Sequence, residues 1–133
     1  MDMTECTPSE TLSLMRSGEL PINYDKIRAL YREKEIATAM FRKLARWGCM
    51  PEGHSFLIGI DLSHPKIEVS EFVRSEYSTE IWLVFQYEFQ IIEATTTSMT
   101  VKLYFSGQGE VFTIPYDSIF RFVDENAEFD LSF

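Results

Sequence analysis

The chain has 133 residues, of which 45% are hydrophobic and 14% aromatic, so it is long enough for one domain with a substantial core. Its net charge of −9 repels phosphate backbones and argues against general nucleic-acid binding. No apolar run approaches the roughly 20 residues of a membrane span, and the N-terminus lacks the basic start and apolar stretch of a signal peptide.

Residues 1–20 show no sustained periodicity and are rich in Ser, Thr and Glu. They are predicted to form a flexible N-terminal tail, with a short helix near Ser9 to Met15. The two cysteines, Cys6 and Cys49, have neither metal-ligand nor disulfide spacing. A reduced, cytoplasmic protein is therefore expected.

A long helix is predicted over residues 24–47, because apolar side chains recur there at helical spacing. Asn23 or Asp25 can cap its start, and Gly48 is a natural stop. The span carries seven basic and three acidic residues, against 5 basic and 18 acidic in the rest of the chain. A solvated helix face is the simplest explanation of this basic cluster, and an anion contact is the alternative. The helix is long for the domain, which indicates a symmetric partner helix.

From about residue 55 to residue 133 the pattern is that of β-structure. Short strands are predicted in six regions: Phe56–Leu62, Ile67–Val69, Met99–Phe105, Glu110–Pro115, Phe120–Val123 and Glu128–Phe133. A polar connection that includes Glu71–Thr79 carries a possible helical turn, and Ser106 to Gly109 forms a hairpin loop. The fold class is α+β: one domain over residues 21–133, with a long helix before a strongly bent antiparallel β-barrel or sandwich.

The stretch from Ile81 to Ile92 is predicted to be the central strand, since β-branched and aromatic residues dominate it. At about 3.3 Å per residue it would extend roughly 40 Å, longer than an ordinary strand. It is therefore expected to bend or to serve two sheets. Gln86 is a polar residue in this otherwise aromatic and aliphatic part of the stretch, and its carboxamide can form hydrogen bonds with a peptide backbone. The alternative for Gln86 is a solvent-facing strand position.

No constellation of catalytic residues emerges, so the chain is predicted not to be an enzyme and to need no cofactor or metal. His54 and His64 lack the neighbouring ligands of a zinc site and suit turns. Asp61 lies in an apolar strand, where a strand-end position with a backbone partner is the simpler explanation. A hydrolase that used Asp61 would need a second acid or a histidine beside it.

The order of these signals resembles the SspB (stringent starvation protein B) adaptors, especially their alphaproteobacterial branch, over Leu20 to Phe133. The landmarks are Tyr24-Asp25, Gly48 to Glu52 followed by His54, Ile60-Asp61 before Pro65, Val84 to Phe89, Phe105-Ser106-Gly107, Ile114 to Tyr116 and Phe129 to Phe133. The family's hairpin usually has glycine where Ser106 stands.

The resemblance implies a proteolytic adaptor that binds ssrA-tagged polypeptides and delivers them to the ClpXP protease through the ClpX ATPase. It also implies a homodimer formed through the helix at 24–47 and an Sm-like barrel that holds the tag as an extended peptide. Gln86 matches the polar strand residue that this branch uses in the tag groove. Phe85, Tyr87, Phe89 and Thr100 are expected to extend the groove wall.

Two expectations bear on partners. Family members end in a flexible tail that docks on ClpX, whereas this sequence stops at Phe133, so either a trimmed chain or a tag binder without delivery is expected. The alternative function is an Sm-like RNA-binding module. It fits less well, because the basic residues gather on the helix rather than at strand tips.

Overall fold

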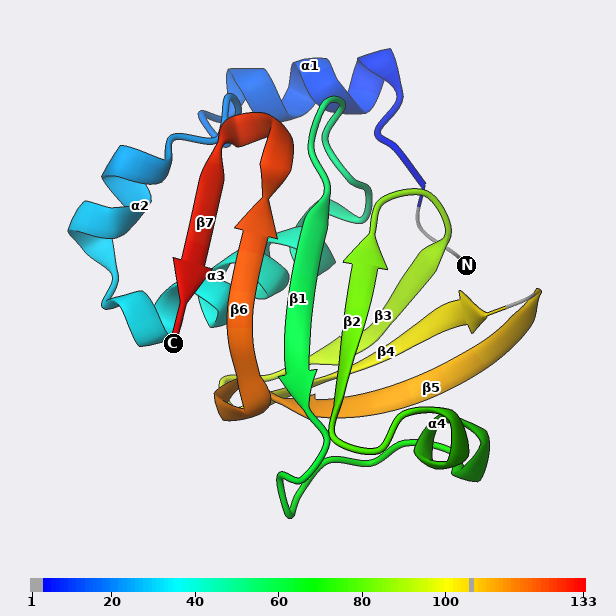
Figure 1. Ribbon diagram of the computed structural model, residues 1–133. Helices are drawn as coiled ribbons and strands as arrows, with labels where there is room; N and C mark the ends of the chain where they lie inside the picture. The colour runs from blue at the N-terminus through cyan, green and yellow to red at the C-terminus, as the bar shows by residue number, and fades with distance from the viewer. Residues whose placement is uncertain (1–3, 106) are drawn as a thin grey trace.

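The structure is a computed structural model that describes residues 4–105 and 107–133 (Figure 1). Its helices are α1 (Pro8–Arg16), α2 (Tyr24–Leu30), α3 (Glu33–Trp47) and α4 (Glu71–Glu76), with 3-10 turns at Tyr116–Ser118 and Glu125–Ala127. Its strands are β1 (Phe56–Asp61), β2 (Glu80–Phe85), β3 (Phe89–Ala94), β4 (Ser98–Phe105), β5 (Gln108–Pro115), β6 (Ile119–Asp124) and β7 (Phe129–Ser132).

The strands form two antiparallel sheets. One has the order β2-β1-β6-β7 and the other the order β3-β4-β5. This confirms the α+β class and the sandwich, whereas the closed barrel is wrong for the part of the chain that the structure describes. Between β5 and β6 the 3-10 turn at Tyr116–Ser118 carries the chain from one sheet to the other, so these consecutive strands do not pair.

The predicted central strand from Ile81 to Ile92 does serve both sheets. β2 pairs with β1 and β3 pairs with β4, while residues 86–88 form a bend between them. The side chains of Ile81, Leu83 and Phe85 are buried along β2, as the alternation of a strand with one inner face requires. The bend then turns the chain so that Phe89 enters the same core from the second sheet.

Helix α3 supplies the other side of the core through an apolar stripe at helical spacing. Its buried residues are Ile36, Ala37, Met40, Phe41 and Leu44. The ring of Phe41 meets Phe85 edge-on at 4.9 Å between centroids, and it meets Phe56 and Phe122 at 5.7 and 6.1 Å. Burying each such ring stabilises the fold by about 1.5–3 kcal/mol.

The single helix predicted over residues 24–47 is wrong, because α2 and α3 are separate helices. Tyr31 and Arg32 have extended backbones, with φ of −125° and −67° and ψ of 148° and 149°. The packing explains the break. Tyr24 of α2 stacks on Phe129 of β7 with centroids 4.1 Å apart, whereas Phe41 of α3 packs into the core between the sheets. One straight helix would not present both residues to these two targets.

The end of α3 lies where the sequence places it. Gly48 adopts the left-handed conformation with φ of 75°, and its N–H donates to the carbonyl of Leu44 at 3.0 Å. The chain then meets the N-terminal segment. The N–H of Cys6 donates to the carbonyl of Met50 at 2.8 Å, and the Met50 N–H donates to Thr4 at 2.9 Å.

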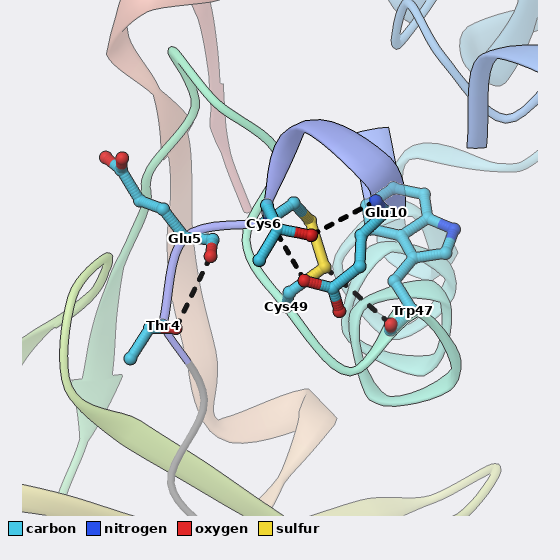
Figure 2. The surroundings of a disulfide bond; sticks show 7 residues. Thr4, Glu5, Cys6, Glu10, Trp47 and Cys49 are labelled. Atoms are coloured by element: carbon cyan, nitrogen blue, oxygen red, sulfur yellow. Dashed lines mark hydrogen bonds between the residues drawn. A yellow bond between two sulfur atoms is a disulfide. The ribbon is translucent and has the colours of Figure 1, made fainter. Parts of the chain in front are cut away.

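Cys6 and Cys49 form a disulfide, with Cα atoms 4.9 Å apart (Figure 2). The prediction of two reduced cysteines is therefore wrong for this structure. A sequence separation of 43 residues carries no recognisable spacing. The pairing depends on the turn at Gly48 and on the backbone bonds to Met50, neither of which a cysteine pattern reveals.

The short helix predicted near Ser9 to Met15 is present as α1. Thr7 caps it: its hydroxyl accepts from the N–H of Glu10 at 3.2 Å, and the Glu10 carboxylate accepts from the N–H of Thr7 at 2.9 Å. These reciprocal bonds form a capping box. The flexibility of residues 1–20 as a unit stays a prediction.

Three smaller regions complete the comparison. Ile67–Val69 is not a strand, because Glu68 makes one isolated bridge to Thr113. The helical turn expected after residue 70 is present as α4. The hairpin joins β4 to β5 with Phe105 opposite Gln108, while Ser106 lies outside the described residues.

None of the described helices is both long and apolar enough to span a membrane.

Candidate functional site

Gln86, Tyr87 and Glu88 form the bend between the two sheets, at the end of β2 and the start of β3. Both strands lie at sheet edges, so each has one side that pairs with no described strand. A free edge offers backbone N–H and C=O groups to an extended peptide. The bend therefore lies at the meeting point of two edges that can accept such a ligand.

Two buried aromatic residues flank the bend, one on each side. Phe85 and Phe89 have fully buried side chains, and their rings meet edge-on with centroids 5.5 Å apart. An open groove therefore cannot have them as its wall, which corrects the expectation for these two residues. They fix the position of the bend instead, because the core around their rings is closely packed.

Gln86 and Tyr87 are the predicted site residues that a ligand can reach at this point. The Gln86 side chain is half-buried, and the Tyr87 side chain is 65% exposed. Neither side chain hydrogen-bonds to another described residue. A half-buried carboxamide without an internal partner can offer both a donor and an acceptor to a ligand.

Thr100 lies elsewhere. Its partner across the ladder is Glu93, whereas the partner of Phe89, next to the bend, is Leu103. Phe89 and Glu93 are four positions apart on β3, which corresponds to about 13 Å along a strand. The hydroxyl of Thr100 lies 3.4 Å from that of Thr113 on β5. The structure therefore does not bring Thr100 to Gln86.

The register instead places the end of β4 near the bend. Phe105, two residues beyond Leu103, is half-buried and contacts the ring of Tyr77 at 6.5 Å and that of Phe112 at 5.9 Å. The sequence placed Phe105 at the end of a predicted strand beside the hairpin, and Tyr77 in a polar connection. The contact between their rings depends on how the second sheet packs against the segment after α4, which no local pattern shows.

A second polar group lies at the same end of this sheet, two strands away from Phe85, where β6 ends. The carboxylate of Asp124 is fully buried, and its Oδ2 accepts from the Tyr24 hydroxyl at 2.7 Å. The same oxygen lies 2.7 Å from Nδ1 of His54. His54 is thus a packed partner of a buried acid rather than a simple turn residue. Desolvation and the neighbouring Asp124 carboxylate raise the pKa of Tyr24 well above its usual range.

The other candidate groups do not assemble into a catalytic or metal site among residues 4–105 and 107–133. Asp61 accepts from the N–H and hydroxyl of Ser63 at 2.9 and 2.6 Å, which lowers the pKa of its carboxyl. It therefore serves as a turn cap. His64 lies 2.8 Å from Asp117, and no group of three metal-binding side chains is found in that part of the chain.

Comparison with known families decides the relationship. The family model described as "Stringent starvation protein B" matches residues 25–133. The chain belongs to the stringent starvation protein B family. The match begins in α2 and includes both sheets, so it covers the bend at Gln86 as well as His54 and Asp124, but neither Tyr24 nor α1. A search of curated proteins finds no match.

Membership in the family places the chain among protease adaptors. Several landmark residues of the family converge in the structure. Tyr24, His54 and Phe129 surround Asp124 or stack beside it, and Phe85 and Phe89 hold the bend. Much of the family pattern in this chain therefore belongs to the framework around the bend.

Proposed function

We propose that this protein is a proteolytic adaptor that binds ssrA-tagged polypeptides and delivers them to the ClpXP protease. The observation that carries the proposal is the half-buried Gln86 carboxamide, which has no hydrogen-bond partner among the described residues and lies at the junction of two sheet edges. The family match over residues 25–133 supports the same function.

In this proposal the tag binds as an extended peptide at the bend. Backbone groups of the tag pair with a free edge of β2 or β3, and the carboxamide of Gln86 bonds to a tag backbone or side-chain amide. Tyr87 offers an exposed aromatic face beside it. Phe85 and Phe89 contribute indirectly, by holding the bend in place.

The adaptor is proposed to act as a homodimer that uses the helical region 24–47, with α3 as the main contact. The solvent side of α3 carries the small residues Thr38 and Ala39 between Glu35 and the cations Arg42 and Arg46. Small residues let two helices approach closely. An antiparallel pair about a two-fold axis would set Glu35 of one protomer near the cations of its partner.

Delivery requires contact with the ClpX ATPase in the cytoplasm. The test is degradation of an ssrA-tagged fluorescent protein by ClpXP at substrate concentrations below the KM of the protease. Addition of the adaptor should lower the apparent KM. An unchanged rate, together with saturable tag binding, would show a tag binder that does not deliver.

Tag binding itself is tested by titrating a fluorescently labelled ssrA peptide. Gln86→Ala should weaken binding by about 1 kcal/mol or more, which is at least about fivefold in Kd. Gln90→Ala is the matched control, since Gln90 is another half-buried glutamine, on β3. Equal affinities of the two variants would remove Gln86 from the site, and no saturable binding at micromolar concentrations would overturn the proposed function.

A further inference from the structure

The outer face of the sheet β2-β1-β6-β7 is not covered by another described layer. In Figure 1 this face points toward the viewer, while α3 lies behind the sheet. Three aliphatic residues form a row across it, since Leu57 of β1 pairs with Val84 of β2 on one side and with Val123 of β6 on the other. Val84 is 55% exposed. This sheet thus carries an apolar row on its solvent side.

Two aromatic residues enlarge the row into an apolar patch. Trp82 is 40% exposed, and its ring meets that of Phe120 edge-on with centroids 5.2 Å apart. We refer to Leu57, Trp82, Val84, Phe120 and Val123 together as the Trp82 patch. Trp82 and Val84 are exposed, and the other three residues are half-buried. A contiguous apolar patch at the surface marks an interaction site more often than scattered apolar residues do.

The patch depends on a glycine. A Cβ at Gly59 would lie 2.5 Å from Cζ of Phe120, so any side chain there would require the ring to move. The register between β1 and β6 also shifts between Gly59 and Ile60, so Phe120 lies over the bare backbone. Only glycine leaves room for this ring. Phe120 is therefore held on the outer face by the backbone, ready to contact a ligand.

Arg121, the cation among the described residues that line the patch, is already paired. Arg121 lies over the Trp82 ring at 5.8 Å and makes two hydrogen bonds to the carboxylate of Asp130, one of them at 2.9 Å. The Trp82 indole N–H donates to Glu80 at 3.1 Å. These contacts fix the orientation of the indole.

Apart from Arg121, the charged residues that line the two cavities beside the patch are acidic. A cavity of about 470 Å³ is lined by Leu57, Trp82, Val123 and neighbours that include the exposed Glu125 and Glu128. A smaller cavity, about 350 Å³, is bordered by Asp61, Glu80 and Phe120. The apolar surface thus has an acidic rim, because Arg121 is neutralised by Asp130.

We propose that the Trp82 patch docks a polypeptide segment of a partner protein that carries apolar side chains flanked by Lys or Arg. Apolar side chains would cover the row, and the cations would face the acidic rim. A second copy of this chain fits less well, since it would bring two acidic rims together in a protein of net charge −9. The patch lies on the outer face of the sheet, although Val84 precedes Gln86 by two residues, and the proposal does not depend on tag binding.

The test uses two capped heptapeptides of alternating sequence, Leu-Lys-Leu-Lys-Leu-Lys-Leu and the same peptide with Glu in place of Lys. Calorimetry at low salt should show saturable binding of the lysine peptide and at least tenfold weaker binding of the glutamate peptide. The tryptophan emission should shift to shorter wavelength in the wild type, and the Trp82→Phe variant should lose the shift, which assigns it to Trp82 rather than Trp47.

Val84→Glu separates docking from general attraction to an acidic protein. The added charge would strengthen or preserve a purely electrostatic association, whereas the loss of apolar contact should weaken docking at least fivefold. Val111→Glu is the matched control, because Val111 is similarly exposed, at 47%, on the other sheet. Undiminished binding by Val84→Glu, equal binding of both peptides, or conversion of a dimer to a monomer by Val84→Glu would each overturn the proposal.

Discussion

The hydroxyl of Tyr24 donates a hydrogen bond to Oδ2 of Asp124 across 2.7 Å, joining the first turn of α2 to the last residue of β6. The carboxylate is fully buried, and its Oδ1 has no partner among the described groups. Asp124 therefore relies on Tyr24 and His54 to compensate for its burial.

Removing that hydroxyl should be costly. Tyr24→Phe keeps the stacking on Phe129 but leaves Asp124 with His54 as its remaining side-chain partner, so the free energy of unfolding should fall by about 1–3 kcal/mol. Urea unfolding at pH 7 measures the change. Tyr31→Phe is the control, because the Tyr31 hydroxyl has no hydrogen bond to another described residue. Equal stability of Tyr24→Phe and the wild type would show that the bond contributes nothing.

Alkaline pH should destabilise the fold through its buried tyrosines. Burial raises the pKa of Tyr116 to about 12 and that of Tyr24 further. Above about pH 10, where a tyrosine in the unfolded chain ionises, the unfolded state binds fewer protons than the folded one. The free energy of unfolding therefore falls as pH rises. The stability that Tyr116 contributes is lost between about pH 10 and the pKa of Tyr116 in the folded protein.

Urea unfolding at pH 8, 10 and 11 measures this slope. The Tyr116→Phe variant should show a shallower decline than the wild type, whereas deprotonation of lysines affects both proteins alike. Parallel curves for the two proteins would contradict the assigned role of Tyr116.

Reduction of the disulfide should lower stability. Cys6 and Cys49 close a loop over a separation of 43 residues, for which the chain-entropy relation gives up to about 4 kcal/mol. The thermal midpoint should therefore fall when dithiothreitol is added. The Cys6→Ser, Cys49→Ser double variant should unfold at the reduced midpoint and be insensitive to reductant. A wild type that is equally insensitive would contradict the pairing.

Gly59→Ala should destabilise the protein by about 1–3 kcal/mol, since the new methyl group meets the ring of Phe120 at 2.5 Å. A double-mutant cycle isolates the cause. In a Phe120→Ala background the same substitution should cost much less, and the coupling between the positions should exceed about 0.5 kcal/mol. If the effects of Gly59→Ala and Phe120→Ala on stability were additive, the requirement for glycine at position 59 would have a cause other than the Phe120 ring.

Much of the fold could be predicted because its signals are local. The stop at Gly48, the strand at Phe56–Asp61 and the pairing of β4 with β5 each follow from a few adjacent residues. The break at Tyr31 is different, since the apolar spacing continues through it. Only the distant position of Phe129, against which Tyr24 stacks, shows why α2 must separate from α3.

The candidate site was predictable only in part. The polar residue Gln86 is visible in an aromatic stretch that the sequence predicts to bend or to serve two sheets, but the sequence does not locate the bend at residues 86–88. Without the bend, Phe85 and Phe89 seem as accessible as Tyr87, although the structure buries both. The distance between Thr100 and the bend could not be predicted for a related reason, because the register of β3 against β4 is set by packing across the sheet.

The bend at residues 86–88 also has a mechanical consequence. Hydrogen bonds from β2 run to β1 and those from β3 run to β4, so the bend is fastened to two separate ladders. A pulling force applied to a ligand held at Gln86 would divide between them, and neither sheet would carry the whole load. A binding site placed in the middle of a single strand would lack that sharing of tension.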